Sequence, residues 1–159
     1  MRLVVIAVGR NRAGPARDLF DDYAARIRKL GPGQGIQGFD LIEIAESRAA
    51  TPALRAEREG QEILDVAAPA QICVFDERGE DLPSTDVARL ISRERDGGTA
   101  AIALVIGGPD GLAEPVRDRA ARIIAFGRAT WPHLLARAML AEQVYRALTI
   151  LGRHPYHRG

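Results

Sequence analysis

An apolar run that ends abruptly at a glycine-rich turn constrains the fold of this chain more than any other stretch. Residues 101–106 read Ala-Ile-Ala-Leu-Val-Ile, and the segment Gly107–Gly111, Gly-Gly-Pro-Asp-Gly, follows at once. An apolar run without alternation predicts a strand covered on both faces, as in parallel sheets between helices. Glycines permit a sharp turn and a close approach to a ligand, and we expect a side chain at Gly107 to occupy ligand space. Taken alone, such a segment is more often a simple turn.

Strand and helix patterns alternate along the whole chain. Apolar runs predict strands over residues 2–8, 39–44, 70–75, 101–106 and 122–126. Helical periodicity, capping residues and breakers predict helices over residues 15–30, 51–66, 84–95, 112–121 and 132–150. The glycine-rich segment 31–38 predicts a flexible loop without helix or strand.

Five successive strand-helix units predict an α/β fold in which helices flank a mostly parallel sheet. In such folds ligands bind beyond the carboxyl ends of the strands, where the strand order reverses. The 159 residues are enough for one domain of this kind and too few for two, so we expect a single domain over residues 1–159.

Several classes of protein do not fit the composition. No window of about 18 uncharged apolar residues occurs, and the apolar N-terminal segment is too short for a signal peptide, so we expect a cytosolic protein. Cys73 is the single cysteine and lies in an apolar run, so we expect a small buried side chain without a disulfide partner. The glycine fingerprints of dinucleotide and P-loop sites are absent, as is the elbow of serine hydrolases.

Positive charge gathers in the last quarter of the chain, although the net charge is only +1. From Arg117 to Gly159 there are eight arginines and two acids, together with all three histidines of the chain. Guanidinium groups suit phosphates and base edges, so this quarter is a candidate nucleic-acid surface. A run of charge alone is as often only a solvated face.

Three candidate ligand loops follow consecutive expected strands, at residues 75–77, 107–111 and 127–132. In a parallel sheet these strand ends meet at one edge, where backbone amides and carbonyls could bind an adenine or an amino acid moiety. Phe75, Phe126 and Trp131 offer apolar cover for such a ligand, and plain core packing is the alternative for all three.

The segment His154–Arg158, His-Pro-Tyr-His-Arg, concentrates proton acceptors, an aromatic ring and a guanidinium. We expect this tail to contact a substrate. The histidine spacing does not match a tetrahedral metal motif, and no cysteine or acidic cluster accompanies it, so we expect no metal site.

Four motifs, in order, carry a resemblance to a known family. They are Ile106–Leu112, Thr130–His133 with Arg137, Glu142–Ala147 and His154–Arg158. Together they resemble the 23S ribosomal RNA pseudouridine N3-methyltransferase family of the SPOUT class over essentially the whole chain. The resemblance implies a deep C-terminal trefoil knot, S-adenosylmethionine as the cofactor, an obligate homodimer, and 23S rRNA or the ribosome as partner. Pattern reasoning alone would not predict a knot.

The resemblance also implies site residues. The family's methyl-donor site falls on Phe75, Gly107, Phe126, Gly127, Arg128, Ala129, Thr130 and Trp131. Candidates for holding the RNA are Arg10, His133, Arg137 and Tyr156, of which Tyr156 could stack on a flipped base.

The expected target is the N3–H of a pseudouridine, which must lose its proton as it attacks the methyl group. Stabilising the developing anion is the catalytic task, for which Arg158, His157 and His154 are the candidates. Methylation of another RNA position and a non-catalytic RNA-binding or ribosome-assembly role remain as alternatives.

Overall fold

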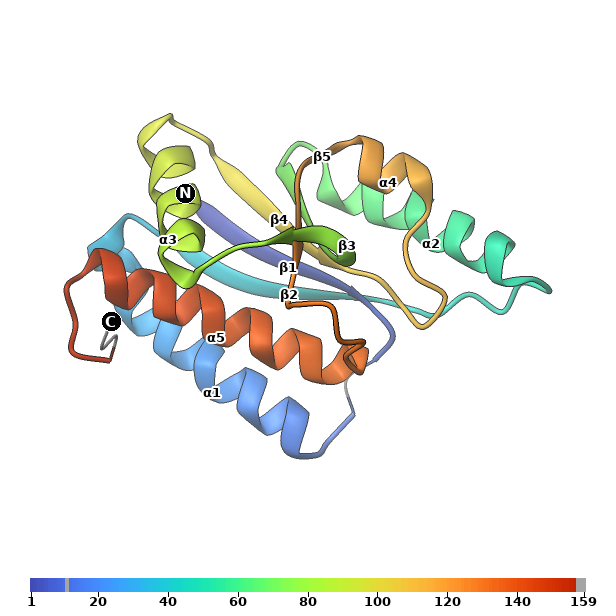
Figure 1. Ribbon diagram of the computed structural model, residues 1–159, viewed down its shortest axis with the longest axis horizontal. Coiled ribbons are helices and arrows are strands. Elements are labelled where there is room, and N and C mark those ends of the chain that lie inside the picture. Colours follow the sequence, from blue (N-terminus) through green and yellow to red (C-terminus); the bar gives the residue numbers. More distant parts are fainter. Residues whose placement is uncertain (11, 157–159) are drawn as a thin grey trace.

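Five parallel strands form one sheet in the computed structural model, which describes residues 1–10 and 12–156 (Figure 1). The strands are β1 (Arg2–Val8), β2 (Gly38–Ile44), β3 (Gln71–Asp81), β4 (Ala101–Ile106) and β5 (Ala120–Ala125). Their order is β2-β1-β4-β3-β5, and every neighbouring pair is parallel. The predicted parallel α/β sheet is therefore confirmed.

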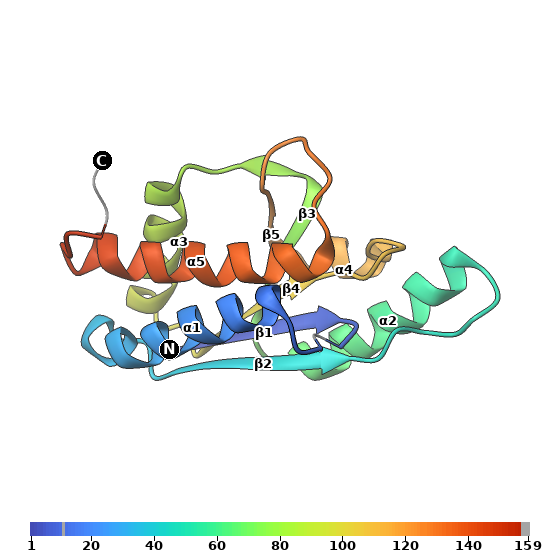
Figure 2. The same ribbon diagram turned by 90° about the horizontal axis from the view of Figure 1, so that it is seen from below.

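Helices cover both faces of this sheet (Figures 1 and 2). They are α1 (Pro15–Leu30), α2 (Pro52–Ala67), α3 (Ser84–Asp96), α4 (Glu114–Asp118) and α5 (His133–Leu151). Buried residues of α1, α3 and α5 share one core cluster, and those of α2 and α4 share the other. Within the described ranges, no helix is long and apolar enough to cross a membrane.

Strand β1 shows why the apolar runs do not alternate with polar residues. Leu3 and Val5 pack into the core under α1 and α5, whereas Ile6 and Val8 pack into the core under α2. All four side chains are fully buried, and each full burial of this kind contributes about 1.5–3 kcal/mol. Cys73 is buried as predicted, and burial raises the pKa of its thiol to about 11.

The N-terminus of α2 follows the local signals in the sequence. Thr51 precedes the helix in an extended conformation, and its hydroxyl accepts a hydrogen bond from the Leu54 N–H at 3.2 Å. Pro52 occupies the first helical position, where no backbone N–H is needed.

The prediction of an unstructured loop over residues 31–38 was wrong. A 3-10 helix, η1 (Gly31–Gln34), continues from α1, and β2 already begins at Gly38. Ile36 explains the difference, because its side chain is only 2% exposed and inserts into the core. Gly31 lies against it so closely that a Cβ there would be 2.9 Å from the Ile36 carbonyl oxygen.

Strand β3 is longer than predicted, because it continues past Phe75 to Asp81. Ile124 of β5 pairs with both Phe75 and Glu80, so the residues between these two bulge out of the strand. At Gly79 the two backbones nearly touch, and a Cβ there would lie 2.5 Å from the carbonyl carbon of Ile124. The bulge directs residues 76–78 toward the carboxyl edge of the sheet.

Candidate functional site

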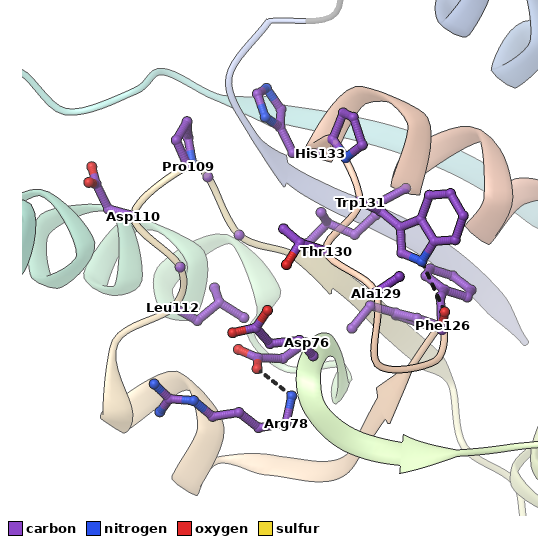
Figure 3. A pocket seen from close by; sticks show the side chains of 18 of the residues that line it. Asp76, Arg78, Pro109, Asp110, Leu112, Phe126, Ala129, Thr130, Trp131 and His133 are labelled. Carbon is purple, nitrogen blue, oxygen red and sulfur yellow. Dashed lines mark hydrogen bonds between the residues drawn. The ribbon is translucent and has the colours of Figure 1, made fainter.

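A cleft of about 780 Å³ lies at the carboxyl ends of β3, β4 and β5 (Figure 3). Its size is within the range typical of small-molecule sites. Residues 75–78, 106–112, 126–127 and 129–133 supply most of its walls, so the three loops converge as the sequence predicted. Of the expected donor-site residues, those that line the cleft are Phe75, Gly107, Phe126, Gly127, Ala129, Thr130 and Trp131.

The loop after β4 is closed by its own backbone. The Gly111 N–H donates to the Gly108 carbonyl at 3.0 Å, and Gly111 adopts a positive φ of 79° that favours glycine. A Cβ at Gly107 would lie 2.8 Å from Cγ of Leu112 and 3.1 Å from the Gly111 carbonyl. A side chain at Gly107 would therefore collide with the returning limb of the loop, and the expectation that it would also occupy ligand space stays a prediction.

The loop after β5 is preformed around two aromatic rings. Phe75 and Phe126 stack with centroids 5.1 Å apart and planes at 24°. The indole of Trp131 donates to the Phe126 carbonyl at 3.0 Å and remains 42% exposed (Figure 3). Gly127 has a positive φ of 82°, and its N–H donates to Oδ1 of Asp81 at 3.0 Å. The cleft thus has an apolar wall on a fixed backbone.

The opposite wall is an ion pair that the sequence analysis did not identify. Arg117 of α4 donates to Oδ2 of Asp76 at 3.0 Å, and the other oxygen of Asp76 accepts the Arg78 N–H at 3.0 Å. The Arg117 and Asp76 side chains are 13% and 8% exposed. Because 41 residues separate them, no local pattern could have paired them.

His133 begins α5 and lines the cleft, as its predicted role in binding substrate would require. Its pKa is lowered first by burial and then by the nearby Arg137 guanidinium, against a smaller opposing effect of Glu46. The shift favours the neutral imidazole, in which one ring nitrogen can donate a hydrogen bond and the other can accept one.

Arg137 does not lie where an RNA phosphate could reach it. Its side chain is fully buried, and burial lowers its pKa. The guanidinium donates to the carbonyls of Val8 at 2.5 Å and Gly9 at 2.8 Å, and to Oε1 of Glu43 at 3.0 Å. The predicted phosphate contact is corrected: Arg137 ties α5 to the carboxyl ends of β1 and β2.

Two other arginines provide exposed cations near the cleft. Arg10 follows β1, whose carboxyl end lies beside that of β4, and Arg128 lies in the loop after β5. Both side chains are exposed. Arg128 does not line the cleft, although its neighbours Gly127 and Ala129 do, and its place among the donor-site residues stays a prediction.

Residues 154–156, the described part of the tail, lie at the opposite end of α5 from the cleft. Tyr156 packs edge-on against Tyr145 with centroids 4.8 Å apart, and the Arg146 guanidinium lies 5.1 Å from its ring centroid. Its hydroxyl donates to Oε1 of Glu142 at 3.1 Å and lies 3.2 Å from the Tyr23 hydroxyl. These contacts anchor Tyr156 to α1 and α5 in this chain, and its expected base-stacking role stays a prediction.

Of the three residues expected to act in catalysis, the structure describes only His154. His154 is exposed, and its Nδ1 accepts the Tyr156 N–H at 3.2 Å. His157 and Arg158 lie outside the described residues. Within residues 1–10 and 12–156, no three histidine, cysteine, aspartate or glutamate side chains are grouped so as to hold a metal ion.

Comparison with known proteins identifies the class that this fold and cleft define. Residues 1–157 match the family model described as "Predicted SPOUT methyltransferase", so the chain belongs to the SPOUT methyltransferase family. This confirms the predicted enzyme class, which transfers a methyl group from a methyl donor.

Relatives of known name are similar over their whole length. The "Ribosomal RNA large subunit methyltransferase H" of Xanthobacter autotrophicus is 50% identical over 159 residues, which cover 99% of each chain. That of Methylorubrum extorquens is 52% identical over 161 residues, covering all of this chain and 98% of the relative.

Two solved structures show the same fold at low sequence identity. A probable methyltransferase from Bordetella pertussis has a TM-score of 0.54 at 16% identity, covering 92% of this chain and 93% of its own. A probable methylase family protein from Haemophilus influenzae has a TM-score of 0.52 at 13% identity, covering 99% and 70%. These two likenesses bear on the fold alone.

Proposed function

We propose that this protein methylates N3 of a pseudouridine in 23S rRNA, with S-adenosylmethionine as the donor, on the ribosome in the cytoplasm. The observation that carries the proposal is the preformed cleft at the carboxyl ends of three adjacent strands, in a chain about 50% identical to proteins named ribosomal RNA large subunit methyltransferase H. The proposed active unit is a homodimer of single-domain chains, and the trefoil knot stays a prediction from the family resemblance.

The residues of the cleft fit S-adenosylmethionine. The stacked Phe75 and Phe126 rings offer an apolar wall for a base, and the loops after β4 and β5 present backbone amides and carbonyls to polar groups. Because Asp76 is paired with Arg117, the charge of that wall is compensated before any ligand arrives. When bound, the donor supplies an electrophilic methyl group on a sulfonium.

The chain must orient the pseudouridine and stabilise the charge that develops when N3 loses its proton. An arginine or histidine beside the ring can carry out this task, and Arg158, His157 and His154 are the proposed groups. Arg10 and Arg128, exposed at the same edge of the sheet, are proposed to bind RNA phosphates.

The length of α5 supports an active site that is shared between two copies of the chain. His133 in the first turn lines the cleft, whereas Tyr156 is anchored beyond the last turn. The 19 residues of the helix span about 28 Å, and this length separates Tyr156 from the cleft of the same chain. We therefore propose that the tail of one protomer completes the cleft of its partner.

The direct test is incubation with radiolabelled S-adenosylmethionine and either ribosomes or naked 23S rRNA, followed by nuclease digestion and mass spectrometry. Label on N3 of one pseudouridine is the expected result. Ala129→Trp, which would fill the cleft from an exposed loop position, serves as the inactive control. Label at another nucleotide, or none with an intact donor-binding protein, would contradict the proposal.

The sharing of the site is tested by mixing two inactive variants. A chain that lacks residues 154–159 should lose methyl transfer but keep its donor affinity within about threefold, since its cleft lies at the other end of α5. Co-expressed with the Ala129→Trp chain, it should regain partial activity in heterodimers. No recovery, with both variants dimeric, would show that each chain completes its own site.

A further inference from the structure

Helix α2 supports the loop after β4 from below. Arg55 donates to both oxygens of Asp110, at 2.6 and 3.0 Å. One turn further on, Glu59 lies under Gly108, where a Cβ would be 3.4 Å from Oε2 of the carboxyl group. Because residues four apart share one helix face, these two side chains and the loop form a continuous contact.

Gly108 is held between two elements. A Cβ there would lie 2.9 Å from Cγ1 of Val8 on β1, in addition to its 3.4 Å contact with Glu59 of α2. The absence of a side chain therefore allows the loop to descend onto both β1 and α2. Val8 and Glu59 are therefore the two side chains against which the loop packs at Gly108.

Glu59 is an unusual residue for such a position, because only 4% of it is exposed. Oε1 accepts the Ser47 N–H at 2.7 Å, whereas Oε2 is buried without a hydrogen-bond partner among the described residues. A charged carboxylate with one oxygen unpaired in the interior is costly.

The surroundings of Glu59 favour its neutral form. Burial is the main cause that raises its pKa, and the carboxylates of Asp110 and Glu46 act in the same direction. The hydrogen bond from the Ser47 N–H is the main opposing effect, second in size to burial, and the Arg55 guanidinium also lowers the pKa. Glu59 is thus a buried acid that packs against Gly108 of the loop, and its pKa is raised in part by Asp110 of the same loop.

We propose that Glu59 is a positioning residue for the methyl-donor loop Gly107–Gly111. Its carboxyl group, held by Ser47, supports Gly108 from below, while Arg55 holds the tip of the loop at Asp110. This role rests on the proposed function, since it takes the ligand of the loop to be S-adenosylmethionine. Glu59 itself does not line the cleft and touches no reacting atom.

The role is tested by donor affinity in variants of the full chain. Glu59→Ala removes the support and should weaken binding by about tenfold, whereas Glu59→Gln keeps the shape and an oxygen that can accept the Ser47 N–H, and should bind within about twofold. Glu62→Ala is the matched control, because Glu62 lies exposed on the same helix. Glu59→Met, which keeps the volume but lacks the bond to Ser47, should lose affinity as Glu59→Ala does.

Isothermal titration should use both S-adenosylmethionine and S-adenosylhomocysteine, which lacks the sulfonium charge. A displaced loop weakens both ligands equally and leaves the affinity for RNA unchanged, unlike a general loss of folded protein. Wild-type affinity in Glu59→Ala and Glu59→Met would overturn the role, as would an equal loss in Glu59→Gln or a loss confined to S-adenosylmethionine. If the wild-type protein binds neither ligand, the donor site itself is overturned.

Discussion

Replacing Arg137 by methionine should destabilise the protein strongly and leave the salt dependence of its RNA binding unchanged. The guanidinium is fully buried and donates three hydrogen bonds, two of them to the backbone carbonyls of Val8 and Gly9. Methionine has a similar length and fills much of the same volume, so the perturbation is mainly the loss of these bonds. The carbonyls at the end of β1 would then be buried without their donor.

The expected loss in the free energy of unfolding follows from the three hydrogen-bond acceptors of Arg137. Each bond from a charged donor contributes about 1.5–3 kcal/mol, and breaking a buried pair typically costs about 3–5 kcal/mol. Glu43 keeps 25% of its side chain exposed, so water can replace the guanidinium there and the lower end applies. A loss of about 3 kcal/mol should lower the melting temperature by about 6–12 °C in a chain of this length.

Urea unfolding followed by circular dichroism measures this loss directly. Arg128→Met is the matched control, since the Arg128 side chain is exposed and its replacement should leave the free energy of unfolding unchanged. A destabilisation of Arg137→Met below about 1 kcal/mol, the size of an ordinary substitution, would refute the reasoning. A flatter salt dependence of ribosome binding in Arg137→Met would show instead that Arg137 contacts an RNA phosphate.

Three further predictions concern the loops and the pH dependence. Gly107→Val should abolish donor binding and also lower the melting temperature, because its side chain would collide with Leu112. Calorimetry measures the binding and thermal unfolding measures the stability. A variant of unchanged stability that has lost its donor affinity would show instead that the side chain occupies the space of the ligand. Arg10→Ala and Arg128→Ala should each reduce the slope of log affinity against log salt by about 0.7–0.9 if each contacts one phosphate, measured by ribosome binding at several salt concentrations. Glu59 has a raised pKa in the folded chain, so its contribution to stability is complete below the ordinary pKa of glutamate and is lost as the pH rises through the folded value. Glu59→Gln cannot ionise, so urea unfolding from about pH 4 to pH 8 should show its stability rising relative to wild type, and a constant difference would contradict a raised pKa.

Local patterns in the sequence were sufficient to predict the elements and the edge where the cleft lies. Apolar runs without alternation require burial on both faces, and strand-helix alternation forces neighbouring strands to be parallel. Parallel strands bring their carboxyl ends together, so the loops at Phe75, Gly107 and Phe126 converge without any knowledge of side-chain contacts. The Thr51 cap of α2 likewise depends on residues within one turn.

Only the tertiary structure decided the roles of the charged side chains and the relation of tail to cleft. Arg137 lies in a basic part of the chain, but its partners at Val8 and Gly9 are 129 and 128 residues away. The Asp76–Arg117 pair and the continuation of β3 beside Ile124 depend in the same way on contacts between distant segments. A sequence pattern reports the preference of each residue for burial or exposure, whereas partners brought by folding determine whether a guanidinium faces a carbonyl or a phosphate.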